Sequence, residues 1–284
     1  MHIVVAMKKW ILPFILLLAV NLSCQPARQN DPFVSGFEKI DQGNYDEAIH
    51  YFSDMHSKDP NNPKIKMALA SAYAGSAGLK IDRFWNFAKE MRGPAITSES
   101  LKNHPFYLLN KKNIEPFESI IPIETKADLD QAFLLMSGLD TYRTRAQIYP
   151  YVKKDRRPDV EKAVAILNAE NNQGASLYRA ILNGVLLRSD LDDGFDFWNS
   201  VGNPFAEFAT YPLEFERIFC TPVTGPLTVW MNQQFERIVQ ITLDLKKSYP
   251  SDGETYSAYS APLQTYQTEL PKLQAKLIPS GCPK

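Results

Sequence analysis

The chain has 284 residues, of which 44% are hydrophobic and 22% charged, and its formal net charge is −1. This balance excludes a basic surface that would attract nucleic acid or an anionic bilayer by charge alone. The length permits one large domain or two small ones, with a substantial hydrophobic core.

The N-terminus has the order of a secretory signal peptide. Lys8 and Lys9 form a short basic segment, and the uncharged, mostly apolar residues 10–22 follow them. A basic segment, then about seven to fifteen apolar residues, then a small residue before the cleavage site is typical of an export signal. A membrane-spanning helix needs about twenty apolar residues, and Pro13 disfavours an uninterrupted span. Residues 1–23 are therefore predicted to be a signal peptide.

Ser23 and Cys24 resemble a lipobox, the cleavage site of bacterial lipoproteins. In that family an aliphatic residue usually lies three places before the cysteine, where this chain has Asn21. The resemblance implies a diacylglyceryl thioether on Cys24 and an acyl chain, such as palmitate, on its new amino group. Several acyl chains anchor a protein to a membrane more firmly than a single one does. Residues 24–30 are then a lipidated tether. Gln25 favours the outer membrane, because aspartate there is typical of inner-membrane retention.

Lipidation of Cys24 implies a bacterial cell-envelope protein whose body lies in the periplasm or at the cell surface. The alternatives are an ordinary cleaved signal peptide, or an uncleaved anchor with an incidental cysteine. If Cys24 is acylated, Cys220 and Cys282 are the remaining cysteines and allow a single pairing. An oxidising envelope favours this disulfide, which would contribute about 4 kcal/mol by closing a loop of about sixty residues. Two free thiols are the alternative.

Residues 31–92 resemble tetratricopeptide repeats, which are pairs of antiparallel helices. In the first unit a small residue permits close helix packing, a glycine and an aromatic mark the turn, two residues four apart share one helix face, and a proline ends the unit. These places are held by Gly36, Gly43, Tyr45, Ala48, Phe52 and Pro60.

A second, degenerate unit follows directly. Leu69, Ala70 and Tyr73 occupy the apolar, small and aromatic places of its first helix, and residues 82–91 supply its second helix. Residues 70–78 also have a faint similarity to the T-component lipoproteins of tripartite transporters. Tetratricopeptide hairpins present surfaces to protein partners, so the resemblance implies an interaction module.

The remaining segment, residues 93–284, is predicted to continue the same helical body. Thr125 is predicted to cap a helix, and Pro158 suits the first turn of another. Apolar residues recur at helical spacing over 177–185 and 227–245. No alternating strand pattern appears. The predicted fold is therefore all-α, with antiparallel hairpins first and an irregular helical bundle after them.

No pattern in the chain indicates catalysis, a cofactor or a metal. Four acidic residues surround Gly194, but they do not match a calcium loop, and a solvated turn at a helix end is the favoured interpretation. These residues are Asp190, Asp192, Asp193 and Asp196. His50 and His56 lie six apart on one predicted helix, about 240° around it, so they do not converge on a metal. A glycine-rich phosphate loop and a nucleophile elbow are both absent.

Aromatic residues are dense between residues 205 and 219, and Trp85, Trp198 and Trp230 are further aromatics outside that segment. Core packing is the favoured interpretation, and a ligand cavity the alternative. Two functions follow. The first is a non-enzymatic, lipid-anchored envelope protein that acts as a protein-interaction or assembly module. The alternative is a periplasmic T-component-like subunit that binds a small hydrophobic ligand for a transporter. The transporter subunit should contain a deep apolar cavity, whereas the interaction module should present an open groove.

Overall fold

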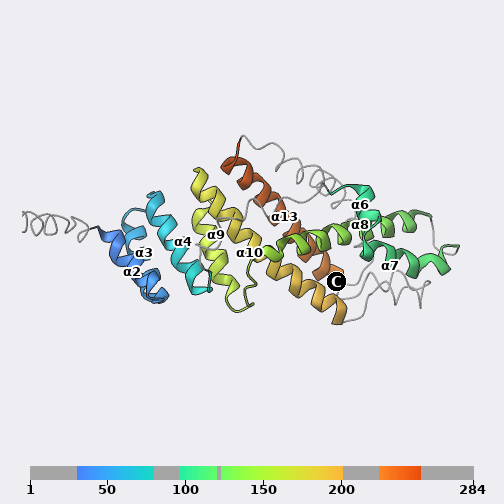
Figure 1. Cartoon of the computed structure of the whole chain (residues 1–284), viewed down its shortest axis with the longest axis horizontal. Helices are drawn as coiled ribbons and strands as arrows, with labels where there is room; N and C mark the ends of the chain where they lie inside the picture. Colours follow the sequence, from blue (N-terminus) through green and yellow to red (C-terminus); the bar gives the residue numbers. More distant parts are fainter. Residues whose placement is uncertain (1–30, 80–95, 120–122, 201–223, 251–284) are drawn as a thin grey trace, which may run out of the picture.

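The computed structural model describes residues 31–79, 96–119, 123–200 and 224–250 (Figure 1). These residues form α-helices joined by turns and two short 3₁₀ helices, and no strand occurs among them, which confirms the all-α prediction. The predicted signal peptide, Cys24, Cys220, Cys282 and the predicted helix 82–91 lie outside the described residues.

The N-terminal part consists of three helices, α2 (Pro32–Asp41), α3 (Tyr45–Lys58) and α4 (Pro63–Ser76), which pack against one another. Side chains satisfy the free amides at two of their starts. Asp31 accepts a hydrogen bond from the amide of Phe33, and Asn62 accepts one from the amide of Lys64. Proline holds the first position of both helices, where a missing N–H costs nothing.

The predicted repeat-signature residues form the contacts within this unit. Gly36 faces the ring of Phe52 so closely that a Cβ there would overlap with it. Ala48 and Phe52 are fully buried on one face of α3. Gly43 has a φ of +79° in the turn between α2 and α3, a conformation that favours glycine. Pro60 lies in the turn before α4.

Helix α4 is buried on two opposite sides. Leu69 packs with Ala48 and Phe52, whereas Ala70 belongs to the main core of the molecule, and the ring of Tyr73 contacts both clusters. Gly75 packs against the ring of Tyr45 so closely that a Cβ there would overlap with the ring. Small side chains on α4 therefore let helices approach from both sides.

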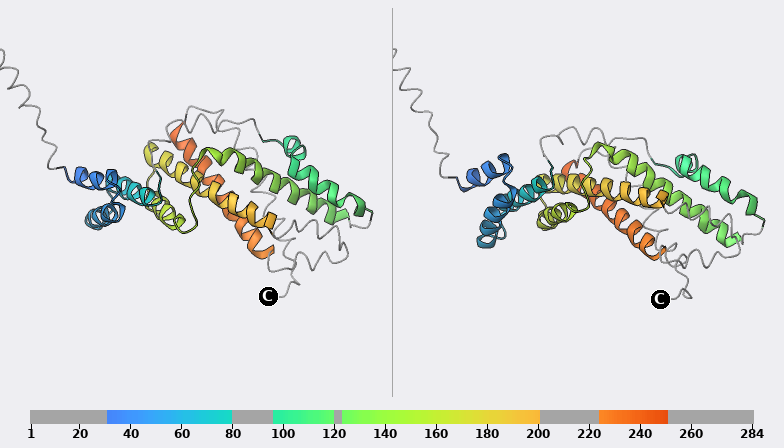
Figure 2. Two further views of the ribbon diagram at one scale, coloured as in Figure 1. Left: turned by 60° about the horizontal axis from the view of Figure 1, so that its bottom comes forward. Right: turned by 90° about the horizontal axis from the view of Figure 1, so that it is seen from below.

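The second neighbour of α4 is α9 (Arg157–Leu167), about eighty residues later in the chain. Figure 2 shows α9 beside α4 and leading into the rest of the bundle. Two polar contacts join this junction. Lys66 Nζ lies 2.8 Å from Glu170 Oε1, and Ser76 Oγ lies 3.0 Å from Asp159 Oδ2.

The rest of the bundle is built around α10 (Gln173–Ser200) and α13 (Thr224–Ser248), which run antiparallel and form the largest helix contact. Helix α8 (Ile123–Arg145) packs against α10, and α6 (Ser98–Lys102) and α7 (Pro105–Ile114) cover α8. The 3₁₀ helices are η3 (Glu115–Phe117) and η4 (Ala146–Ile148). Helix α8 begins two residues before Thr125, the predicted cap. Pro158 lies in the first turn of α9, as predicted.

A buried ion pair joins α9, α10 and α13. Arg179 of α10 donates to both carboxylate oxygens of Asp244 on α13, and these side chains are 2% and 0% exposed. Arg179 also donates to the carbonyl of Leu167, the last residue of α9, and, at 3.1 Å, to that of Glu170, three residues beyond it. Gln240 donates to Asp244 at 3.0 Å. All the charge in this dry site is thus paired.

We expect Asp244→Asn to lower the free energy of unfolding by about 3 kcal/mol, because it leaves the Arg179 guanidinium buried without a counter-charge. Chemical denaturation measured by circular dichroism tests this. The control is Asp54→Asn, which removes an exposed pair with Lys58 and should leave stability unchanged. Equal stabilities of the two variants would contradict the role of the buried pair.

Candidate functional site

A pocket of about 910 Å³ lies between α9, α10 and α13, beside the loop that precedes α9. Its lining runs from Arg157 at the start of α9 to Asn168 just beyond its end. Most lining residues carry charged or amide side chains, and Val164, Phe197 and Trp230 supply apolar surface. The charged and amide residues are Lys154, Arg157, Glu161, Asn168, Asn183, Asp190, Asp193, Gln233, Gln234, Glu236, Arg237 and Gln240.

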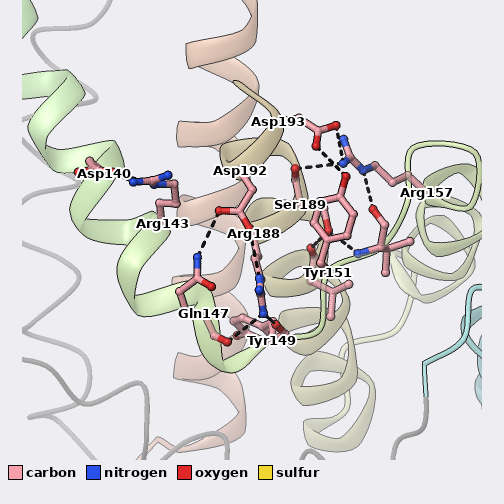
Figure 3. Close-up of polar contacts among 12 residues, drawn as sticks. Asp140, Arg143, Gln147, Tyr149, Tyr151, Arg157, Arg188, Ser189, Asp192 and Asp193 are labelled. Atoms are coloured by element: carbon pink, nitrogen blue, oxygen red, sulfur yellow. Dashed lines mark hydrogen bonds and ion pairs between the residues drawn. The ribbon is translucent and has the colours of Figure 1, made fainter. Parts of the chain in front are cut away.

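Arg157 lines the pocket, and Figure 3 shows its polar contacts. Its guanidinium lies 2.8 Å from a carboxylate oxygen of Asp190 and 2.8 Å from one of Asp193. It also donates to the carbonyl of Ser189 at 3.0 Å and to that of Val152 at 3.1 Å. With only 10% of its side chain exposed, Arg157 holds the start of α9 and the preceding loop against α10.

The loop before α9 has further contacts to α10. Tyr151 Oη donates to Asp193 at 2.8 Å, which raises the pKa of Tyr151. The amide of Val152 donates to Ser189 Oγ at 2.9 Å. Arg188 donates to the carbonyls of Gln147 and Tyr149, so the chain between α8 and α9 is fastened along α10.

Asp190 lies between two arginines. Arg237 of α13 approaches its other carboxylate oxygen at 3.2 Å, opposite the contact with Arg157. Burial raises the pKa of Asp190, and the charges of Arg237 and Arg157 oppose that rise. Burial also lowers the pKa of Arg237, against the opposing effect of Asp190 and Glu161. Because the two arginines face Asp190 and Asp193, the charges of this wall largely neutralise one another.

The predicted solvated turn around Gly194 is wrong. Asp190, Asp192 and Asp193 lie inside the long helix α10, where arginines hold each of them. Gly194 lies within this helix, and a Cβ at its position would overlap with the indole of Trp230 on α13. The close approach of the indole explains why the residue is a glycine. The acidic run is therefore part of a helix interface. Asp196 is exposed.

Three buried polar atoms on the pocket lining have no hydrogen-bond partner in the part of the chain that the structure describes. They are Asn183 Nδ2, Gln234 Oε1 and Arg237 Nε. Asn183 is 5% exposed and Gln234 is 1% exposed, so neither side chain can turn to bulk water. Buried amide groups without a hydrogen-bond partner are rare in folded proteins.

The pocket and the predicted signature residues occupy different parts of the molecule. The signature residues build the α2–α3–α4 unit, whereas the pocket uses Arg157, Asn183, Gln234 and Arg237, which the sequence did not single out as site residues. The sequence signal that could have found Asn183 and Gln234 is a polar residue at a core-facing position within a stripe of apolar residues. Trp230 was noted among the aromatics, and it lines the pocket.

Other sequence candidates do not form a site within the described ranges. His50 and His56 both lie on α3. His104 caps α7 and accepts a hydrogen bond from the amide of Phe106. No group of three or more histidine, cysteine or acidic residues in these ranges could hold a metal ion. Likewise, none of the helices described there is long and apolar enough to cross a membrane.

The family model for the tetratricopeptide repeat matches residues 39–77. The match covers all of α3 and α4, so this segment is similar to tetratricopeptide repeats in both sequence and helix arrangement. Comparisons with curated proteins and with solved structures gave no significant match. The fold thus defines an all-α protein with a tetratricopeptide-like unit at its N-terminal part, and such a repeat indicates protein partners in general.

We expect Arg157→Gln to destabilise the chain by about 2 kcal/mol, because Asp190, Asp193 and two carbonyls lose a donor. Amide hydrogen exchange should also quicken in the loop before α9, including at Val152. The matched control is Arg156→Gln, since the neighbouring Arg156 is 57% exposed and only approaches Asp155 at 3.9 Å. Similar exchange in both variants would show that Arg157 does not hold this loop.

Proposed function

We propose that this chain is a non-enzymatic protein-interaction module, held at the membrane of a bacterial cell envelope by lipid on Cys24. The helical repeat similarity over residues 39–77 supports a protein partner. The basic segment, the short apolar stretch and the Ser23–Cys24 pair support export and lipidation. In this proposal the outer membrane carries the anchor, and the body lies in the periplasm or at the cell surface.

The observation that carries the choice of function is the match of residues 39–77, which cover α3 and α4, to the tetratricopeptide repeat. Such helical hairpins present surfaces to protein partners. The alternative, a subunit that binds a small hydrophobic ligand for a transporter, is supported by the pocket between α9, α10 and α13, whose exposed surface is mostly apolar although charged and amide residues outnumber Val164, Phe197 and Trp230 along it.

Removal of the anchoring cysteine tests the membrane part of the proposal. We expect Cys24→Ala to move the protein from the membrane fraction to the soluble fraction, because the acyl chains are lost. Intact mass of the wild-type protein should exceed that of a chain beginning at Cys24 by the mass of its lipid. The control, Cys220→Ala, should stay in the membrane. A membrane-bound Cys24→Ala protein, or an unmodified wild-type chain beginning at Gln25, would refute lipidation.

Photo-crosslinking in bacteria that make the anchored protein tests the interaction. A photoreactive residue replaces the exposed Asp46 on α3 of the repeat-like unit or, as control, the exposed Lys112 on α7. We expect a discrete protein adduct at position 46 and none at position 112. The absence of a protein adduct at position 46, or identical adducts at both positions, would contradict a partner bound through the repeat-like unit.

A further inference from the structure

Helix α7 presents an apolar face to solvent, opposite the face that packs on the bundle. Its buried residues are Tyr107, Asn110 and Ile114. Four residues at the spacing i, i+3, i+4 and i+7 form the opposite face of the helix, and all four are exposed. They are Pro105, Leu108, Leu109 and Lys112. Leu108 and Leu109 are 52% and 56% exposed, so each leucine keeps about half of its surface in water.

These two leucines differ from exposed aromatic residues elsewhere in the described ranges. Phe37 on α2 packs against the ring of Phe52, with centroids 5.5 Å apart. The hydroxyl of Tyr151 donates to Asp193. Leucine has no polar group that could explain its exposure, and Leu108 and Leu109 both lie about one turn before Lys112. The outward face of α7 therefore offers a contiguous apolar contact with a cation beside it.

The chemistry of this face suits the surface of a lipid bilayer. Leucine side chains enter the boundary between headgroups and acyl chains without a shaped partner, since contact with lipid is not directional. The stem of a lysine can follow them while its ammonium group stays among the phosphate groups. None of the four residues of the face carries a carboxylate, which anionic headgroups would repel. The face thus complements an anionic bilayer in both its apolar surface and its charge.

The proposed anchor brings this face close to a bilayer. Pro32, the first residue of α2, follows Cys24 by eight residues, so an extended chain places it at most about 28 Å from the lipidated cysteine. Helices α2 and α7 lie at opposite ends of the molecule (Figure 1). In the right-hand view of Figure 2 both lie toward the upper side, whereas the first turns of α13 lie toward the lower side. A membrane that holds the anchor can therefore also contact α7.

Attachment at Cys24 lets a weak contact at α7 persist. Two half-exposed leucines supply too little apolar area to hold a free protein at a membrane. In an anchored protein the second contact is intramolecular and gains from the high effective concentration of the bilayer. Contact through α7 therefore orients the body, whereas the lipid on Cys24 retains it.

We infer that the outward face of α7 rests on the membrane that carries the anchor. Leu108 and Leu109 enter the boundary between headgroups and acyl chains, Lys112 lies among the phosphate groups, and the body lies along the bilayer. This inference rests on the proposed lipidation of Cys24, and it adds a second membrane contact and an orientation of the molecule.

The test uses the full acylated chain, reconstituted into vesicles of phosphatidylethanolamine and phosphatidylglycerol, with a photoreactive residue in place of Leu109. We expect mass spectrometry to find phospholipid adducts at position 109. The matched control places the same photoreactive residue at Val229, which is also 56% exposed and lies near the start of α13 (Figure 2). Position 229 should give no phospholipid adduct.

A charge beside the photoreactive residue provides a second measurement. We expect Leu108→Glu to lower the adduct yield at position 109 by about fivefold, because an apolar contact is lost and anionic headgroups repel the carboxylate. The thermal midpoint should not change, since Leu108 is exposed. Val229→Glu is the control and should keep the wild-type adduct yield at position 109.

Three results would overturn the inference. They are the absence of a phospholipid adduct at position 109, equal adducts at positions 109 and 229, and a yield that Leu108→Glu leaves unchanged. A protein adduct at position 109 in bacteria, without a phospholipid adduct, would assign this face to a protein partner and also overturn it.

Intact mass and the crosslinking at position 46 separate this inference from the proposed function. An unmodified Cys24 would refute the anchor and the α7 contact together. Lipid on Cys24 and a protein adduct at position 46, with no phospholipid adduct at position 109, would refute the α7 contact while leaving the anchored interaction module intact.

Discussion

The buried pair of Arg179 and Asp244 fixes the three helices on which the rest of the bundle depends. It ties α10 to α13 and, through two carbonyls, to the end of α9. Arg157 makes an equivalent junction at the start of α9, through Asp190 and then Arg237. The pocket lies between these two arginine junctions. Because a buried guanidinium tolerates little loss of its partners, both ends of α9 are held in register, and the space between the helices keeps its shape.

The N-terminal unit is joined to this frame through a single helix with two buried sides. Small residues along α4 let α3 approach on one side and α9 on the other. Lys66 and Glu170, which lie 2.8 Å apart with about a tenth of each side chain exposed, pair across the second contact. A partner that contacts the tetratricopeptide-like unit therefore contacts an element packed directly on the helix that lines the pocket.

The sequence predicted what local periodicity and spacing determine. Apolar residues at helical spacing gave the helices around 177–185 and 227–245, and the signature residues from Gly36 to Tyr73 gave the first hairpins. It could not predict the site, since the partners of Arg157 lie more than thirty residues away at Asp190 and Asp193. The same limit explains the wrong turn around Gly194. Aspartates and glycine favour turns locally, but distant arginines and an indole outweighed that preference.

The contact between α4 and α9 also sets an order for folding. Helices α2, α3 and α4 are made early, yet the side of α4 that carries Ala70 and Ala74 is covered by a helix that begins about eighty residues later. Contacts of such long sequence separation form slowly, because a large loop must close before they are gained. The side of α4 that faces α9 is therefore buried only after the residues between the two helices have been made and the long loop that they form has closed.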